Sequence, residues 1–257
     1  MTKSFFNTAW KWLFIQLVVT TFMTYFILIV LVEMEWLTPL HVFKTATLNI
    51  RLFTGGLLDT GQSLGIDLGV MIFFCNLSGA IMIVLAFYSV VLFKPIHSQT
   101  QCQWLRRMLL RESSHDLLQV IPFFSKIKRQ ELRATSFILL AAPVLSTLCL
   151  GLLAGTLLAA VHSVSGSSIL AMAYIFPHGF AELMAYLLAC SVPLGTWFAV
   201  YPALEQNDPT LVFQRIDQIA NSEALQGHLK IMINMFLIAG LVEAHLTQKV
   251  IALLNNF

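Results

Sequence analysis

The residues best suited to chemistry lie together inside an apolar run: Pro177, His178, Gly179 and Glu182. His178 and Glu182 are four positions apart, so a helix would place their side chains on one face. A carboxylate inside a membrane-spanning helix must be protonated, paired or exposed to water. We therefore expect a neutral His178 imidazole to donate a hydrogen bond to Glu182. Pro177 suits the first position of a helix, and Gly179 lets another backbone approach closely.

Further polar residues occupy other apolar runs: Glu243 and His245 in the last run, and Asn76 in an earlier one. Glu243 and His245 are two positions apart and point to different sides of a helix, so they cannot both be assigned to one site. The first interpretation is that these groups form interhelical hydrogen bonds that fix packing. The second is an ion, proton or substrate pathway built from Glu182, His178 and Glu243.

A metal-dependent catalytic site is a third interpretation of the same residues. A His-x-x-x-Glu spacing is a weak metal signal, the sequence has no His-Glu-x-x-His motif, and no third ligand has a diagnostic spacing. Four scattered cysteines without a Cys-x-x-Cys pair predict neither disulfides nor a metal site. We therefore predict no catalytic residues, no metal and no cofactor.

The composition is that of a membrane protein. Of the 257 residues, 58% are hydrophobic and only 11% are charged, with a mean hydropathy of +0.79. A soluble globular domain has about 25% charged residues. These values predict an all-α, polytopic helical bundle that forms a single integral membrane domain over residues 1–257. The lipid bilayer is an expected partner, and nucleic acid is not. The sequence also has no phosphate-binding loop or nucleotide fingerprint.

The apolar runs predict five membrane spans, near residues 12–32, 69–93, 136–161, 168–203 and 231–246. A span needs about 20 residues, and the fourth run is much longer than that. Pro177 follows about ten residues of that run, roughly 15 Å along a helix, which is near the bilayer midplane. We therefore expect a half-helix over 168–176 and a full helix from Pro177. A second break at residues 191–193 would give six spans.

The distribution of basic residues orients the chain. Lysine and arginine are enriched in cytoplasmic segments, and ten of the fifteen basic residues precede the first span or lie between the second and third. The N-terminus and the basic amphipathic loop 94–133 should therefore be cytoplasmic, and the amphipathic segment 34–68 extracytoplasmic.

The segments between the spans also have patterns that predict structure. The amphipathic pattern of residues 38–58 predicts an interfacial helix. Residues 101–132 predict helices on the anionic inner leaflet, or a docking surface for a partner. Residues 204–229 predict a loop with a short helix.

Two small residues predict a close helix contact. Gly151 and Gly155 form a Gly-x-x-x-Gly pattern in the third span. Such a pattern allows two helices to approach closely. We expect packing within the chain ahead of dimerisation.

Residues 140–195 resemble the stage II sporulation protein M (SpoIIM) family of integral membrane proteins. The family pattern is Asn-Gly-x-x-x-Gly, a gap, and then a Pro-His-Gly…Glu string followed by small apolar residues. Leu150 stands where the family has asparagine, and Phe180–Ala181 where it often has Ile-Phe. Residues 238–245 are similar to the family's apolar-Glu-Ala motif in the last span. The matching positions are Gly151, Gly155, Pro177, His178, Gly179, Glu182, Glu243 and Ala244.

The resemblance implies a non-enzymatic scaffold, or the membrane subunit of a multiprotein complex, in the bacterial cytoplasmic membrane. Sporulation members of the family look like scaffolds that recruit peptidoglycan-degrading enzymes. Protein partners are expected, among them further copies of the chain. The alternative is a transporter or permease with a midplane site at His178, Glu182 and Glu243, paired with a separate ATPase. An intramembrane hydrolase that uses His178 and Glu182 is a third reading.

Overall fold

The computed structural model describes residues 2–42, 44–46, 68–93 and 122–242. Within these ranges, side chains are described except at residues 2–3, 68–69, 91–92, 122–123 and 174–178. The described residues contain helices and turns and no strand. The all-α prediction is therefore confirmed.

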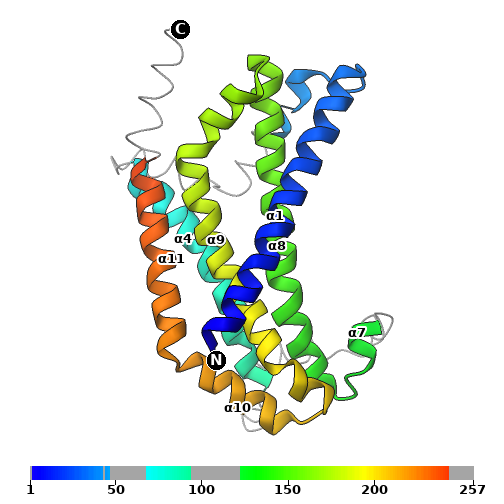
Figure 1. Cartoon of the computed structure of the whole chain (residues 1–257), viewed down its shortest axis with the longest axis vertical. Helices are drawn as coiled ribbons and strands as arrows, with labels where there is room; N and C mark the ends of the chain where they lie inside the picture. The colour runs from blue at the N-terminus through cyan, green and yellow to red at the C-terminus, as the bar shows by residue number, and fades with distance from the viewer. Residues whose placement is uncertain (1, 43, 47–67, 94–121, 243–257) are drawn as a thin grey trace. The chain divides into compact units, whose positions relative to one another are not determined.

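Among the described residues, five helices are long and apolar enough to cross a membrane, as the sequence predicts (Figure 1). Two are longer than the others, with 36 and 38 residues. A helix of 36 residues is about 54 Å long, whereas the hydrocarbon core of a bilayer is about 30 Å thick. These helices therefore extend well beyond the apolar layer. The five helices are α1 (Thr2–Glu33), α4 (Leu68–Ser89), α8 (Gln130–Ser165), α9 (Ser168–Glu205) and α11 (Glu223–Val242).

The helix α9 differs from its prediction. It is one continuous α-helix from Ser168 to Glu205, so the expected separation at Pro177 into a half-helix and a full helix is wrong. The second break near 191–193 is absent as well. Proline removes one backbone donor and clashes with the preceding turn, which bends a helix without necessarily ending it. Figure 1 shows that α9 changes direction in its first half.

The chain forms two compact units that alternate along the sequence. Unit 1 comprises residues 1–13, 81–146 and 188–229, and unit 2 comprises residues 14–80, 147–187 and 230–257. The boundaries fall inside the five long helices, so each of these helices contributes to both units.

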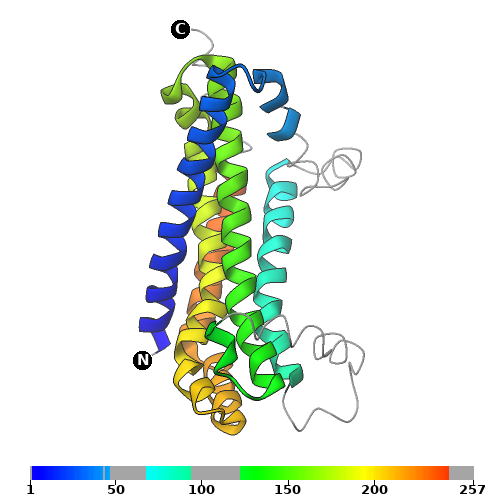
Figure 2. The same ribbon diagram turned by 90° about the vertical axis from the view of Figure 1, so that its right-hand side faces the viewer.

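Unit 2 is built on a close contact between α1 and α8, which run side by side in the same direction (Figure 2). Alanines from α8 pack against residues 39–46, which are helical at 39–42 and 44–46. The buried centre of this cluster consists of Val42, Ala46, Ala159 and Ala160. The start of the segment predicted as an interfacial helix is therefore helical, and residues 47–58 lie outside the described residues.

Unit 1 has a larger core. The C-terminal half of α9 is enclosed, and the span that contains it has 72% of its apolar window buried. Around it lie η1 (Val90–Phe93), α7 (Pro122–Ser125), α10 (Pro209–Ala220) and the ends of the long helices. The fully buried side chains of this unit include Phe6, Leu13, Phe87, Phe93, Ile127, Leu132, Leu139, Leu204, Ile216 and Leu225.

The helix α10 is the short helix predicted within residues 204–229. Asp208 caps it by accepting hydrogen bonds from the backbone of Thr210 and Leu211, at 2.9 and 3.2 Å. Pro209 occupies its first turn, where no backbone donor is needed. The last span begins at Glu223, eight residues before its predicted start at 231. Of residues 94–133, only those from 122 onward are described.

Candidate functional site: polar contacts between helices

The carboxylate of Glu182 on α9 meets the side chain of Asn76 on α4. Asn76 Nδ2 donates a hydrogen bond to Glu182 Oε1. One turn further along α9, the Tyr186 hydroxyl donates to Asn76 Oδ1 at 3.5 Å, the long end of the hydrogen-bond range. All three side chains are partly buried. The hydrogen bonds thus run in one direction, from Tyr186 to Asn76 and from Asn76 to the carboxylate of Glu182.

A glycine on α4 makes room for this arrangement. A Cβ atom at Gly79 would lie 2.8 Å from the Tyr186 hydroxyl oxygen, closer than real Cβ contacts allow. The ring of Tyr186 also packs edge-to-face against Phe236 of α11, with ring centroids 5.0 Å apart. Gly79 therefore lets Tyr186 reach Asn76, and Phe236 supports the tyrosine ring.

Glu182 has one partner that the sequence did not pair with it, Asn76 on α4. The expected hydrogen bond from His178 to Glu182 stays a prediction. The side chain of His178 lies outside the described residues, and so do Glu243 and His245. Gly179 is buried within α9. Of the predicted polar site, the described residues therefore bring together Glu182 and Asn76.

The two glycines of the Gly-x-x-x-Gly pattern lie where α8 approaches α1. A Cβ atom at Gly151 would be 2.7 Å from Thr20 Cβ, and one at Gly155 would be 2.5 Å from the backbone oxygen of Thr21. No larger residue fits without moving one helix. The contact lies within the chain, as the pattern predicted.

A second polar group joins α1 and α8 in unit 2. The Tyr25 hydroxyl hydrogen-bonds His162 Nδ1, and their rings stack with centroids 5.7 Å apart. The same hydroxyl contacts Ser168 Oγ at 3.0 Å. Gly166, with φ of +68°, makes the turn between α8 and α9 that carries Ser168 to this position. The cluster therefore joins the start of α9 to α1 and α8.

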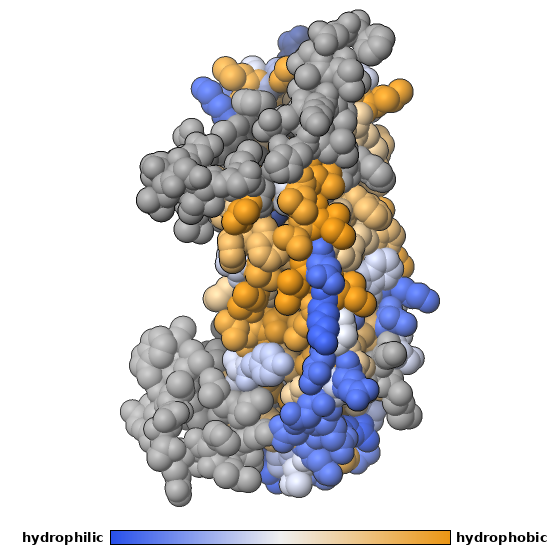
Figure 3. Space-filling view, turned by 90° about the vertical axis from the view of Figure 1, so that its left-hand side faces the viewer, coloured by the Kyte–Doolittle hydropathy of each residue, from blue (hydrophilic) through white to orange (hydrophobic). Residues whose placement is uncertain are grey.

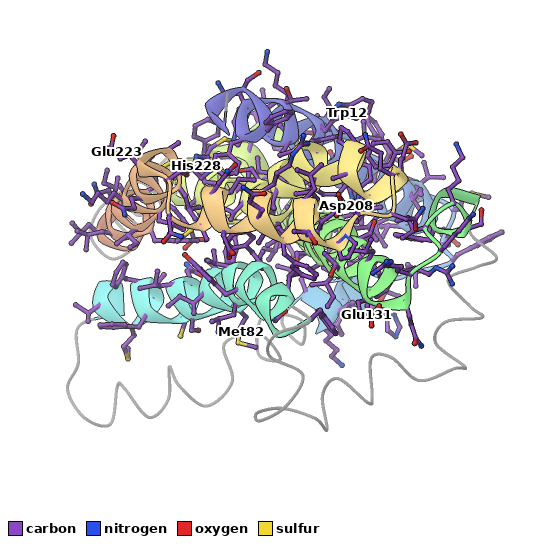
Figure 4. The ribbon with its side chains drawn as sticks, turned by 90° about the horizontal axis from the view of Figure 1, so that it is seen from below. Trp12, Met82, Glu131, Asp208, Glu223 and His228 are labelled. Atoms are coloured by element: carbon purple, nitrogen blue, oxygen red, sulfur yellow. The ribbon has the colours of Figure 1, made fainter. Side chains whose placement is uncertain are left out.

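Two polar pairs fasten α9 in unit 1. Ser191 Oγ lies 2.7 Å from Nε2 of His228 on α11, and that nitrogen also lies 3.1 Å from the Leu188 carbonyl oxygen. Figure 4 labels His228 on α11. Trp197 Nε1 donates to Ser136 Oγ on α8 at 3.0 Å, and Ser136 is fully buried.

The serine–histidine pairs do not form a catalytic triad among the described residues. A serine nucleophile needs a histidine base that a third group orients, commonly a carboxylate. His162 contacts Tyr25 and Ser168, and His228 contacts Ser191 and a backbone carbonyl. Across the described parts of the chain, no three His, Cys, Asp or Glu side chains are grouped closely enough to hold a metal ion. In the structure, these groups make hydrogen bonds between helices.

Sequence reasoning did not single out Tyr25, His162, Ser191, His228 or Trp197. Single hydroxyl and ring groups are common in apolar helices, and no spacing relates residues more than thirty positions apart. The one available signal was the position of two histidines, which stand at ends of predicted spans. A histidine at the end of a span has no sequence pattern that identifies its partner.

The outer faces of the long helices are apolar. In Figure 3, apolar side chains in orange gather in the middle of the visible face. On α1 the character of the exposed face changes within one turn. Ser4, Asn7, Thr8 and Lys11 are exposed before the change, and Trp12, Ile15 and Val19 are exposed after it. We therefore infer that the membrane boundary on α1 lies near Lys11 and Trp12.

Comparison with protein families identifies the region that contains these contacts. Residues 122–248 match the model of Stage II sporulation protein M, SpoIIM. This region is a SpoIIM-family domain. The resemblance noted in the sequence is thereby confirmed. No curated protein and no solved structure matches the chain.

The SpoIIM domain contains α8, α9, α10 and α11, and thus one partner of every interhelical contact described above. The helices α1 and α4 precede it and supply Tyr25 and Asn76. The chain thus contains a SpoIIM-family domain, and its described residues include five helices that are long and apolar enough to cross a membrane.

Proposed function

We propose that the protein is a non-enzymatic membrane scaffold or membrane subunit of a multiprotein complex. The observation that carries this proposal is the use of polar groups in the spans. In four interhelical contacts, Glu182–Asn76, Tyr25–His162, Ser191–His228 and Trp197–Ser136, each polar group hydrogen-bonds a group on another helix. Three of these contacts join α9 to α4, α11 and α8. Such contacts hold helices in one arrangement, which is what a docking platform requires.

The SpoIIM domain supports the same proposal, because the family resemblance implies work within a complex. The bilayer contacts the apolar outer faces, and protein partners contact the polar ends. We place the protein in the bacterial cytoplasmic membrane with its N-terminus in the cytoplasm, on the basis of the basic residues around the first three spans.

The test is purification of the tagged, full-length protein from native membranes in a mild detergent, followed by mass measurement and proteomics. We expect a stoichiometric complex, absent when an untagged strain is processed in parallel. A partner-free monomer that shows its full cellular function after reconstitution alone would contradict the proposal.

A second candidate function, a transporter or permease, is favoured by one observation. Glu182 is an ionisable group inside a span, at the end of the donor chain from Tyr186 through Asn76. Ionisable groups at such depth often lie on ion or proton pathways. Purified protein in liposomes would then show flux that Glu182→Gln abolishes. Absence of flux in the unmodified protein, with assembly intact, would eliminate this candidate.

A further inference from the structure

A short loop in unit 1 presents three positive charges. Lys126, Lys128 and Arg129 lie between α7 and α8, and all three are exposed. Ile127, in their midst, is only 1% exposed. The loop is therefore anchored by one apolar side chain while its cations face outward.

A buried arginine hydrogen-bonds the backbone of this loop. Arg133 is 3% exposed, and its Nε and Nη2 atoms both donate to the Ile127 carbonyl oxygen, at 3.1 and 2.6 Å. A guanidinium presents its donors in a fixed planar fork, so two bonds to one oxygen define its position. The carbonyl group of the anchor residue cannot rotate freely.

Asn207 also hydrogen-bonds the backbone of the loop. Its Oδ1 accepts a hydrogen bond from the Lys128 backbone N–H at 2.6 Å, and its Nδ2 donates to the Lys126 carbonyl oxygen at 3.4 Å. Asn207 has φ of +54°, a left-handed conformation that asparagine tolerates better than most residues. The Asn207 side chain thus hydrogen-bonds the backbone on both sides of Ile127.

The carboxylates nearest in sequence to the loop and to Asn207 have other partners or positions. Glu205 accepts a hydrogen bond from the Tyr201 hydroxyl at 2.6 Å, and Asp208 caps α10. Glu131 lies in the first turn of α8, where the helix dipole favours a negative charge. Figure 4 labels Asp208 and Glu131 on these elements.

The loop lies well away from the membrane boundary on α1. Gly195 of α9 abuts Phe6, and Trp197 contacts Ser136, so these residues mark a common level in unit 1. Lys11 lies five residues beyond Phe6 toward the membrane, about 7 Å along the helix. Arg129 directly precedes α8 and lies seven residues from Ser136 in the opposite direction, about 10 Å at the rise of an α-helix. The sum of about 17 Å exceeds the headgroup layer, which is roughly 5–8 Å thick in each leaflet.

We propose that Lys126, Lys128 and Arg129 form a docking site for an acidic segment of a soluble partner protein, on the side of the membrane that holds the N-terminus. The proposal rests on the proposed function, since it names the kind of partner and the surface that receives it. Charge complementarity sets the chemistry of the partner, and the distance from the bilayer favours a soluble protein over lipid headgroups.

The rigid backbone is what makes the loop a site rather than a charged surface. An exposed ion pair contributes little by itself, because ordering two long side chains offsets its attraction. Because the backbone that carries the three cations is already ordered, binding does not also have to order the loop. Asn207 is therefore a positioning residue, which acts on the partner through Lys126 and Lys128.

Zero-length carbodiimide cross-linking of the native complex tests the proposal, because the reagent joins lysine amines directly to carboxylates. We expect Lys126 and Lys128 to be joined to aspartate or glutamate residues of a second protein. The triple substitution K126Q/K128Q/R129Q should weaken that complex about tenfold, the effect of three exposed ion pairs. Asn207→Gly keeps the left-handed backbone and all the charges but removes the brace, and should reduce these cross-links several-fold.

The matched control K11Q/K44Q/K230Q removes the same total charge at exposed positions elsewhere and should leave the complex unchanged. Thermal unfolding of each variant checks that its fold is intact.

Three outcomes would contradict the proposals. A complex that survives the triple substitution, with cross-links elsewhere, would overturn this inference and leave the proposed function standing. Loop-dependent retention of anionic lipid, seen by native mass spectrometry, would assign the site to lipid and overturn it too. No complex in the unmodified protein would overturn the proposed function itself.

Discussion

Glu182 illustrates how a single residue in a span can be read. Its carboxylate accepts a hydrogen bond from Asn76 Nδ2. Asn76 therefore needs a hydrogen-bond acceptor at position 182, and this acceptor need not carry a negative charge. The bond joins α4 to α9 within unit 2. A structural role and an ion-handling role therefore make different demands on the same side chain, and substitutions can separate them.

We expect Glu182→Gln to change the free energy of unfolding by less than about 1 kcal/mol, because glutamine keeps an oxygen for Asn76. Glu182→Leu should cost about 1–3 kcal/mol, since it leaves a partly buried amide without its acceptor. Chemical denaturation in detergent measures both values, and Glu205→Gln at an exposed position serves as the control. If glutamine were as damaging as leucine, the charge itself would stabilise the fold.

Asn207 allows a second test at the residue scale. With φ of +54°, Asn207→Ala loses the side-chain bonds and also strains the backbone, whereas Asn207→Gly loses only the bonds. Alanine should therefore be the more destabilising substitution, by about 1 kcal/mol. Thermal unfolding of the two variants decides the point. Equal stabilities would mean that the left-handed conformation stores no strain.

At the scale of elements, the packing of α1 on α8 depends on the absence of side chains. A Cβ atom at Gly155 would lie 2.5 Å from the Thr21 backbone oxygen, and backbone cannot move aside as a flexible side chain can. The helix α11 offers a contrast within the same chain, because a Cβ atom at Gly227 would meet nothing within 4 Å.

We expect Gly155→Ala to destabilise the protein by about 1–3 kcal/mol, the usual cost of overpacking. Gly227→Ala should instead stabilise it by about 0.4–1 kcal/mol, because alanine restricts the unfolded chain and favours a helix. Both changes add one methyl group, so opposite signs in denaturation experiments would isolate the effect of contact. A stabilising Gly155→Ala would show that α1 and α8 are not held this closely.

The cap of α10 is a further property of an element. Asp208 satisfies two backbone donors that the first turn of the helix leaves unpaired. Asp208→Ala should cost about 0.5–2 kcal/mol, and Asp208→Ser should restore most of the loss, because serine is also a favourable cap. Hydrogen exchange of residues 210–213 would locate the effect. Unchanged protection in the alanine variant would contradict the capping role.

At the scale of the whole molecule, the change of exposed character on α1 defines one crossing of the bilayer. Asn7 is exposed before the change, and Trp36 is exposed after the helix has ended. We expect Asn7→Cys and Lys128→Cys to react with a membrane-impermeant maleimide from one side of the membrane, and Trp36→Cys from the other. The protein with its native cysteines alone gives the background. Labelling of all three positions from one side would exclude this topology.

The sequence by itself determined the class of protein, and it predicted the five long apolar helices that the described residues contain. Low charge and long apolar runs require a helical membrane protein, because backbone polar groups must be satisfied internally in lipid. The Gly-x-x-x-Gly pattern and the Pro-His-Gly…Glu string indicated the SpoIIM family, which residues 122–248 confirm. These properties are local in the chain, so a linear pattern can reveal them.

Only the tertiary structure decided how the polar groups are partnered and whether α9 breaks. Pro177 predicted an interruption, yet α9 continues through it, because a long helix tolerates the loss of one hydrogen bond when its other turns persist. The partner of Glu182 lies 106 positions away in the chain, and His228 lies 37 positions from Ser191. Contacts at such separations depend on helix packing, which no spacing along a single chain encodes.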